Sequence, residues 1–340
     1  GKLERIFELH KTDNKMYYIV PNISVFDDLE RYFAFSFISS DVVEDLKRNP
    51  SSIERMYEID VGGSIIISPK VADDLVDEIV AYKRIVNELA NEFGFMFNDP
   101  TIMLIMADAK KQFPSRSDGR FTARSTNSAE FYPALNQLNV FRKEEGRKLL
   151  LHELSHRADM EKHIRDDNDI VQDWGKRWAI QRLNNTDVML SESVVEAFAQ
   201  FVNVTTSASD ADDFDHMFNG MWTNELMFGI YQTAKILYTS RFKTNNEFVT
   251  KSSNKRVIES TSTVEYHIFK TILMLNFSEF YVMYKNNRIN ELLDMTYNFA
   301  LNNVEYNATI DDLIKSFKDD GSKLFKTGRM SIIECKMDKY

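Results

Sequence analysis

Residues 149–156 have the sequence LLLHELSH, and this stretch is the part of the chain that says most about its fold. It contains the pattern His-Glu-x-x-His, with the histidines at His152 and His156 and the glutamate at Glu153. On a helix of about 3.6 residues per turn, positions four apart lie about 40° apart on one face, so both imidazoles can reach one zinc ion. The three leucines that precede the pattern are expected to bury the helix and hold it rigidly.

Glu153 has a different expected role. It lies about 100° around the helix from His152, too far to bind the same ion but close enough to touch a water molecule that the ion holds. Zinc lowers the pKa of such a water toward about 7, and a neighbouring carboxylate can take its proton and pass it to the leaving amine of a peptide. Glu153 is therefore the expected general base, although an ordinary helix with two histidines would show the same pattern.

A zinc site of this kind needs a third ligand, and three residues compete for the position. Asp159 follows the second histidine closely, but a helix that continues unbroken carries it away from the ion. His163 lies a few residues further along. Glu192 begins a second helical segment in which Glu196 follows one turn later, so that Glu192 can bind the ion while Glu196 accepts the remaining N–H of a ligand histidine.

The surrounding sequence predicts strands and helices in alternation before the pattern, and mainly helices after it. Residues 121–132 are expected to form an edge strand over the helix, where an extended substrate can pair with its main chain. Little Gly and Pro punctuation favours long helices. The other predicted elements are strands at 64–68, 102–106 and 135–141, and helices at 71–93, from about 143, and at 188–202, 216–242, 263–285 and 288–301.

The histidine pattern, together with Glu192-x-x-x-Glu196-Ala197-Phe198, resembles the gluzincin metallopeptidases, among them the catalytic domain of anthrax lethal factor and the Pro-Pro endopeptidases. The resemblance implies an α+β, zincin-like metallopeptidase fold, with a small twisted mixed sheet over the histidine helix and a mainly helical C-terminal half. It also implies zinc as the cofactor and assigns the roles of the site residues. The implied zinc ligands are His152, His156 and Glu192, with Glu153 as general base and Glu196 behind a ligand histidine.

The chain departs from these families at one position. They place a tyrosine seven residues before the ligand glutamate, and Asn185 occupies that position here. The group that stabilises the developing oxyanion is then expected to come from the C-terminal half, and such donors are often worth about 3 kcal/mol. His267 and Tyr231 rank first among the candidates, followed by Tyr238 and Tyr266.

These patterns predict three parts: an N-terminal, mostly helical extension (1–56), a zincin active-site region (57–206) and a helical C-terminal subdomain (207–340). The expected function is that of a zinc-dependent endopeptidase acting on a protein or peptide substrate. One alternative is a catalytically decayed zincin-fold structural or interaction protein, for example a virion or toxin component; the missing tyrosine favours it and the intact Glu153 disfavours it. The other alternative is a helical scaffold that binds no metal.

Composition narrows the choice of partners. The chain has 42 Lys and Arg against 52 Asp and Glu, a formal charge of −10, which disfavours nucleic acid as a partner. The single cysteine, Cys335, cannot form an intrachain disulfide or a multi-cysteine metal site. No apolar run approaches the roughly 20 residues of a membrane span, so a soluble, disulfide-free chain is expected. The sequence reveals neither the compartment nor the oligomeric state.

Overall fold

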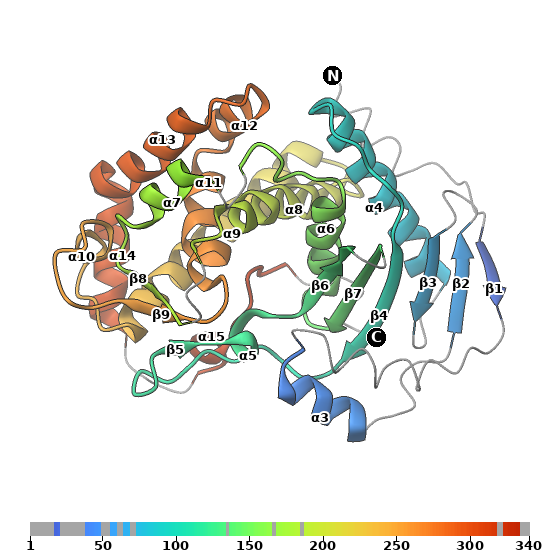
Figure 1. The fold of residues 1–340 in the computed structure, drawn as a ribbon, viewed down its shortest axis with the longest axis horizontal. Coiled ribbons are helices and arrows are strands. Elements are labelled where there is room, and N and C mark those ends of the chain that lie inside the picture. Colours follow the sequence, from blue (N-terminus) through green and yellow to red (C-terminus); the bar gives the residue numbers. More distant parts are fainter. Residues whose placement is uncertain are drawn as a thin grey trace.

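The chain folds into a β-rich part and a larger helical part, which lie side by side in Figure 1. Helix α6 (Gly146–Arg157) lies between the two parts, and α8 (Leu190–Ala208) packs on it from the helical part. The predicted α+β class is confirmed. This computed structural model describes residues 17–20, 38–48, 55–59, 64–68, 73–133, 136–164, 168–183, 187–317 and 322–333.

The larger sheet of the described residues has six strands, in the order β1-β2-β3-β4-β7-β6. The pairs β3–β4 and β4–β7 are parallel, and the other three pairs are antiparallel, so the sheet is mixed. Strand β6 forms one edge and lies beside α6 (Figure 1). The strands are β1 (Tyr17–Val20), β2 (Arg55–Ile59), β3 (Ser64–Ser68), β4 (Thr101–Ala107), β6 (Ala129–Tyr132) and β7 (Gln137–Arg142).

The central strands of the sheet are buried on both faces. In β4 and β7 the residues Ile102, Leu104, Leu138 and Val140 belong to the main hydrophobic core, and Met103, Asn139 and Phe141, which point to the opposite face, are buried as well. Helix α4 (Asp73–Glu92) connects the parallel strands β3 and β4, and its apolar stripe belongs to the same core. Helix α6 packs on β6 and β7, which fixes the histidine pattern against the edge of the sheet.

Helix α8 is the centre of the helical part. It packs on α6, α9, α11 and the π-helical segment Glu265–Phe269, and it is apolar around most of its circumference. A helix surrounded on this many sides provides a rigid support for its polar side chains. The other helices are α3 (Ser40–Arg48), α5 (Ala123–Thr126), α7 (Asp169–Gly175), α9 (Phe214–Thr239), α10 (Asn245–Val249), α11 (Lys270–Leu275), α12 (Phe277–Lys285), α13 (Ile289–Asn302), α14 (Val304–Ser316) and α15 (Lys323–Lys326).

Two stretches differ from their predicted form. The predicted helix at 263–285 is divided into the π-helical segment, α11 and α12, with a break at Asn276. The polar stretch at residues 244–263 contains α10 and strand β9. This strand is the middle one of a second sheet, which is parallel and has the order β5-β9-β8. The strands of this sheet are β5 (Arg120–Phe121), β8 (Ile180–Arg182) and β9 (Val257–Glu259).

The prediction of one edge strand over residues 121–132 is wrong. Strand β5 ends at Phe121, α5 follows, and only Ala129–Tyr132 pair with β7 as the edge strand β6. The backbone N–H of Ser125 bonds to the carbonyl of Thr122, a helical turn that is incompatible with an extended chain.

The predicted domain boundaries fall inside elements of this structure. Residue 56 lies within β2, and the described part of residues 1–56 includes strand β1 as well as α3. Because β1 and β2 pair with each other and β2 pairs with β3, this segment belongs to the sheet on which the histidine helix packs. Residue 206 lies within α8. None of the helices in the described ranges combines the length and apolar character needed to span a bilayer.

Two glycines on α9 provide a matched test of packing in the helical part. A Cβ added to Gly229 would collide with Thr271 Oγ1, whereas one added to Gly220 would meet nothing within 4 Å. We expect Gly229→Ala to lower the free energy of unfolding by about 1–3 kcal/mol through overpacking. Gly220→Ala should raise it by up to about 1 kcal/mol through helix propensity. Urea denaturation measures both, and equal shifts in the two variants would contradict the packing described for α9.

Candidate metal centre

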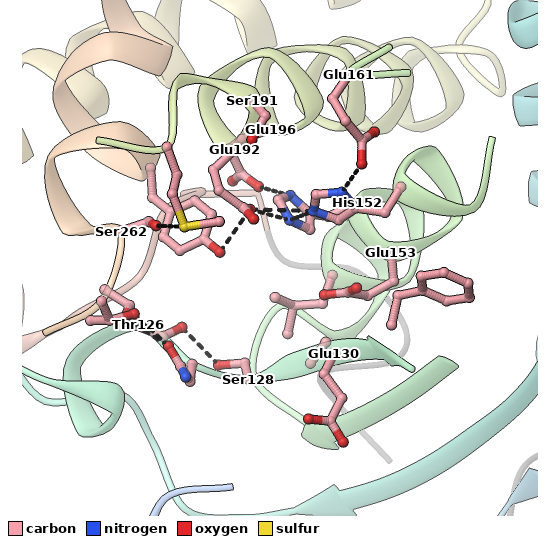
Figure 2. A pocket seen from close by; sticks show the side chains of 18 of the residues that line it. Thr126, Ser128, Glu130, His152, Glu153, Glu161, Ser191, Glu192, Glu196 and Ser262 are labelled. Atoms are coloured by element: carbon pink, nitrogen blue, oxygen red, sulfur yellow. Dashed lines mark hydrogen bonds and ion pairs between the residues drawn. The ribbon is translucent and has the colours of Figure 1, made fainter. Parts of the chain in front are cut away.

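Three side chains from α6 and α8 converge on one point. His152 Nε2 lies 3.1 Å from His156 Nε2 and 3.2 Å from the Oε2 atom of Glu192. The third separation, from His156 Nε2 to the same carboxylate oxygen, is 3.3 Å. Figure 2 shows the side chains of His152 and Glu192 pointing toward each other at the pocket. The predicted combination of these three residues is therefore present, and they form the metal-compatible group of the described residues.

The three separations match the size of a small divalent ion. Ligand atoms in a tetrahedron with metal–ligand bonds of 2.0–2.1 Å lie about 3.3 Å from one another. Two imidazoles and one carboxylate are also a donor set that transition metals accept. Burial raises the pKa of Glu192, but the two imidazoles lower it by more, which keeps this carboxylate ionised. The residues fit a bound metal ion in both geometry and chemistry.

A carboxylate behind each imidazole fixes which ring nitrogen can bind metal. His152 Nδ1 lies 2.8 Å from Glu196 Oε2, and His156 Nδ1 lies 2.8 Å from Glu161 Oε1. A carboxylate only accepts hydrogen bonds, so each Nδ1 carries a proton, which leaves each Nε2 as the nitrogen that faces the common point and can bind metal. Such partners raise the basicity of a ligand histidine and hold its orientation. Glu196 therefore takes its predicted place, and Glu161 has the same role for the other ring.

The end of α6 explains why the other two ligand candidates are excluded. The helix ends at Arg157, and Asp159 adopts a left-handed conformation with a φ of 55°, which turns the chain. His163 then lies with its ring 4.9 Å from that of Phe95 and 5.4 Å from that of Tyr284. Neither Asp159 nor His163 belongs to the converging group.

Glu153 lies next to the three converging side chains and lines the same pocket. Figure 2 shows its side chain between them and strand β6. Burial raises the pKa of Glu153 to about 7, although the two imidazoles lower it in part. A carboxyl group with a pKa near neutrality can both accept and return a proton.

Tyr266 is the phenol that reaches the converging group. Its hydroxyl donates to Glu192 Oε2 at 2.9 Å, and its ring lies 5.6 Å from that of His152, nearly edge-on. The π-helical segment is the cause, because its extra residue per turn changes which side chains face the pocket. His267, the next residue, is fully buried, and Tyr231 packs on Phe317 outside the pocket lining. The positions of His267 and Tyr231 therefore do not support their predicted first rank as oxyanion donors.

The pocket itself has a volume of about 1010 Å³ and brings together segments that are distant in sequence. Strand β6 forms one wall, and α6 and the first turns of α8 form the floor with the converging group. Residues 260–262, just after β9, form a further wall. An edge strand thus borders the pocket, but it is shorter than the segment that the sequence predicted.

Comparison with known proteins adds no relative, since no protein-family model, curated protein or solved structure matches the chain. The structure brings five predicted site residues together: His152, Glu153, His156, Glu192 and Glu196. Asn185, the position of the missing tyrosine, lies outside the described residues.

The third-ligand assignment can be tested by metal content. Glu192→Ala removes one of the three donors, so we expect the purified variant to lose its bound divalent metal after dialysis. His163→Ala is the control, because its ring packs on Phe95 and Tyr284 outside the converging group, and it should retain metal at the wild-type ratio. Elemental analysis of both variants decides, and retention by Glu192→Ala with loss by His163→Ala would contradict the assignment.

Proposed function

We propose that the chain is a zinc-dependent endopeptidase of the gluzincin type with a zincin-like fold. The observation that carries the proposal is the convergence of His152, His156 and Glu192 beside the carboxylate of Glu153, in a pocket bordered by an edge strand. A site that only stabilises the fold needs no general base and is usually closed by four protein ligands. Here three donors converge, and the pocket leads to them.

Zinc is the metal that we propose for this donor set. Catalytic zinc sites commonly use three protein ligands of the imidazole and carboxylate type, with one position left for water or substrate. A zinc ion held by these three residues would act as a Lewis acid and lower the pKa of a water molecule toward about 7. The contribution of the protein is to hold the two imidazoles through Glu196 and Glu161, so that both Nε2 atoms point toward the position of the ion.

Three groups of the chain would then act on a peptide. The carboxylate of Glu153 accepts a proton from water and later gives it to the leaving amine. The Tyr266 hydroxyl, which donates to Glu192 Oε2 in this structure, would turn to donate to the substrate carbonyl oxygen as negative charge develops there. Main-chain groups on the edge of β6 that do not pair with β7 hold the substrate in extended form.

Tyr266 bears on the choice between an active and a decayed enzyme. The family tyrosine is replaced by Asn185, which favoured the structural alternative, yet a phenol from another element lies at the converging group. Glu153 is also retained in the pocket. Both observations favour the peptidase over a decayed protein with the same fold.

Glu153→Gln tests the mechanism. The amide keeps the shape of the side chain but cannot accept the proton, so we expect kcat to fall by about 10²-fold or more while metal content stays at the wild-type ratio. Cleavage of a proteome-derived peptide library, compared with the wild type at equal zinc content, measures the change. Wild-type turnover in this variant would contradict the mechanism.

Tyr266→Phe tests the assigned oxyanion donor. Loss of the hydroxyl should lower kcat by about 10–10³-fold with little change in metal content, because the ring and its packing remain. Tyr238→Phe is the control, since Tyr238 packs on Phe317 and Phe325 and does not line the pocket. If the two variants have the same kcat on one substrate peptide, the donor is not Tyr266.

A further inference from the structure

A buried group of charged residues lies directly behind the metal centre and is not explained by the proposed reaction. Its members are Lys148 on α6, Glu196 on α8, Glu145 at the start of α6, and Lys270 on α11. Each is at most 2 % exposed. Burying ionised groups is costly unless they are paired, so their presence behind the metal centre calls for a structural or functional explanation.

Lys148 is the residue that connects this group to the metal centre. It precedes His152 by one helical turn and therefore lies on the same face of α6. Its Nζ donates to Glu196 Oε1 at 2.6 Å, while the other oxygen of that carboxylate is bonded to His152 Nδ1. The carboxylate is thus held at both oxygens, once by the ammonium group and once by the imidazole.

A segment from the C-terminal part of the chain lies beside Lys148. It comprises residues 327–333 and is here called the strap segment. Met330 Sδ lies 3.4 Å from Lys148 Nζ, and Lys270 Nζ donates to the Met330 carbonyl at 2.9 Å. The N–H groups of Met330 and Ser331 donate to Glu145 Oε1. The ammonium group of Lys148 thus contacts both the Met330 sulfur and the carboxylate of Glu196.

A second carboxylate holds the end of the strap segment. Glu225 Oε1 accepts from Ser331 Oγ at 2.8 Å and from the N–H groups of Ile332 and Ile333 at 3.0 and 2.9 Å. Main-chain donors of an irregular segment are satisfied here by buried carboxylates. These bonds hold the strap segment in place beside Lys148.

We propose that Lys148 is a positioning residue for the metal centre: held by the strap segment, it orients Glu196, and Glu196 orients His152. The proposal rests on the proposed zinc site but not on peptide hydrolysis. Two physical effects of Lys148 oppose each other. As a positive charge near the ion it disfavours metal binding, whereas as the anchor of Glu196 it favours binding by fixing the imidazole. The geometry points to the second effect, because the charge of Lys148 is paired with Glu196 at contact distance.

The test is the dissociation constant for zinc, measured by competition with a chelator on the full chain. Lys148→Met should raise the Kd by about 10–100-fold, the usual size of an effect transmitted through a partner of a ligand histidine. Lys83→Met is the matched control, because Lys83 is also buried and paired with a carboxylate, Asp99, but does not line the pocket. It should keep the Kd within about twofold of the wild type.

A double-mutant cycle separates positioning from other effects. If Lys148 acts through Glu196, then adding Lys148→Met to Glu196→Gln should change the Kd by no more than about twofold beyond Glu196→Gln alone. Additive losses would overturn the proposal. A lower Kd in Lys148→Met would also overturn it, since Lys148 would then act only as a charge.

Met330→Ala keeps the proposal testable if Lys148→Met does not fold, as judged by circular dichroism. Removing the side chain beside Lys148 should raise the Kd by about two- to tenfold, less than loss of the lysine itself. An unchanged Kd in Met330→Ala, or in a folded Lys148→Met, would overturn the positioning role while leaving the zinc site intact. If the wild type binds no zinc, both this inference and the proposed function fail.

Discussion

The hydrogen bond between His152 Nδ1 and Glu196 Oε2 joins helices α6 and α8 at the centre of the molecule, and the rest of the metal centre depends on it. It places the first turn of α8 so that Glu192 reaches both imidazoles. The same carboxylate is bonded to Lys148, so one side chain serves both the metal centre and the buried charged group behind it. Burial raises the pKa of Glu196, but Lys148 and His152 lower it by more, and the carboxylate stays ionised.

The site residues lie on elements of different rigidity. The metal-facing side chains come from α6 and α8, whose apolar faces are packed in the core, and such elements hold ligands more precisely than loops do. Tyr266 comes from the π-helical segment and Glu161 from the turn after α6. Because a π-helical turn and a left-handed residue are both strained local choices, their occurrence at the pocket is consistent with a functional role.

The sequence predicted the elements whose signal is local. The two histidines and Glu153 follow from the helical period alone. The strands predicted at residues 64–68 and 102–106 follow from apolar runs and correspond to β3 and β4. Helical spacing offered Glu192 and Glu196 as one choice among three, a resemblance to known enzymes selected them, and the structure places these residues at the predicted contacts.

The residues that the sequence missed depend on changes of backbone that a pattern does not encode. Glu161 reaches His156 only because Asp159 turns the chain with a positive φ. Tyr266 rather than His267 faces the pocket because a π-helical turn interrupts the expected helix. Among the residues that the sequence analysis missed, Lys148 is the one that a sequence pattern could have revealed. It lies four residues before His152, which places it on the same side of α6 as that histidine.

Anomalous diffraction from crystals grown with zinc tests the central claim most directly. Data collected on either side of the zinc absorption edge locate the ion without reference to activity. The account predicts one anomalous peak about 2.0–2.2 Å from His152 Nε2, His156 Nε2 and a carboxylate oxygen of Glu192. A peak bound to other residues, or none at these three, would contradict it.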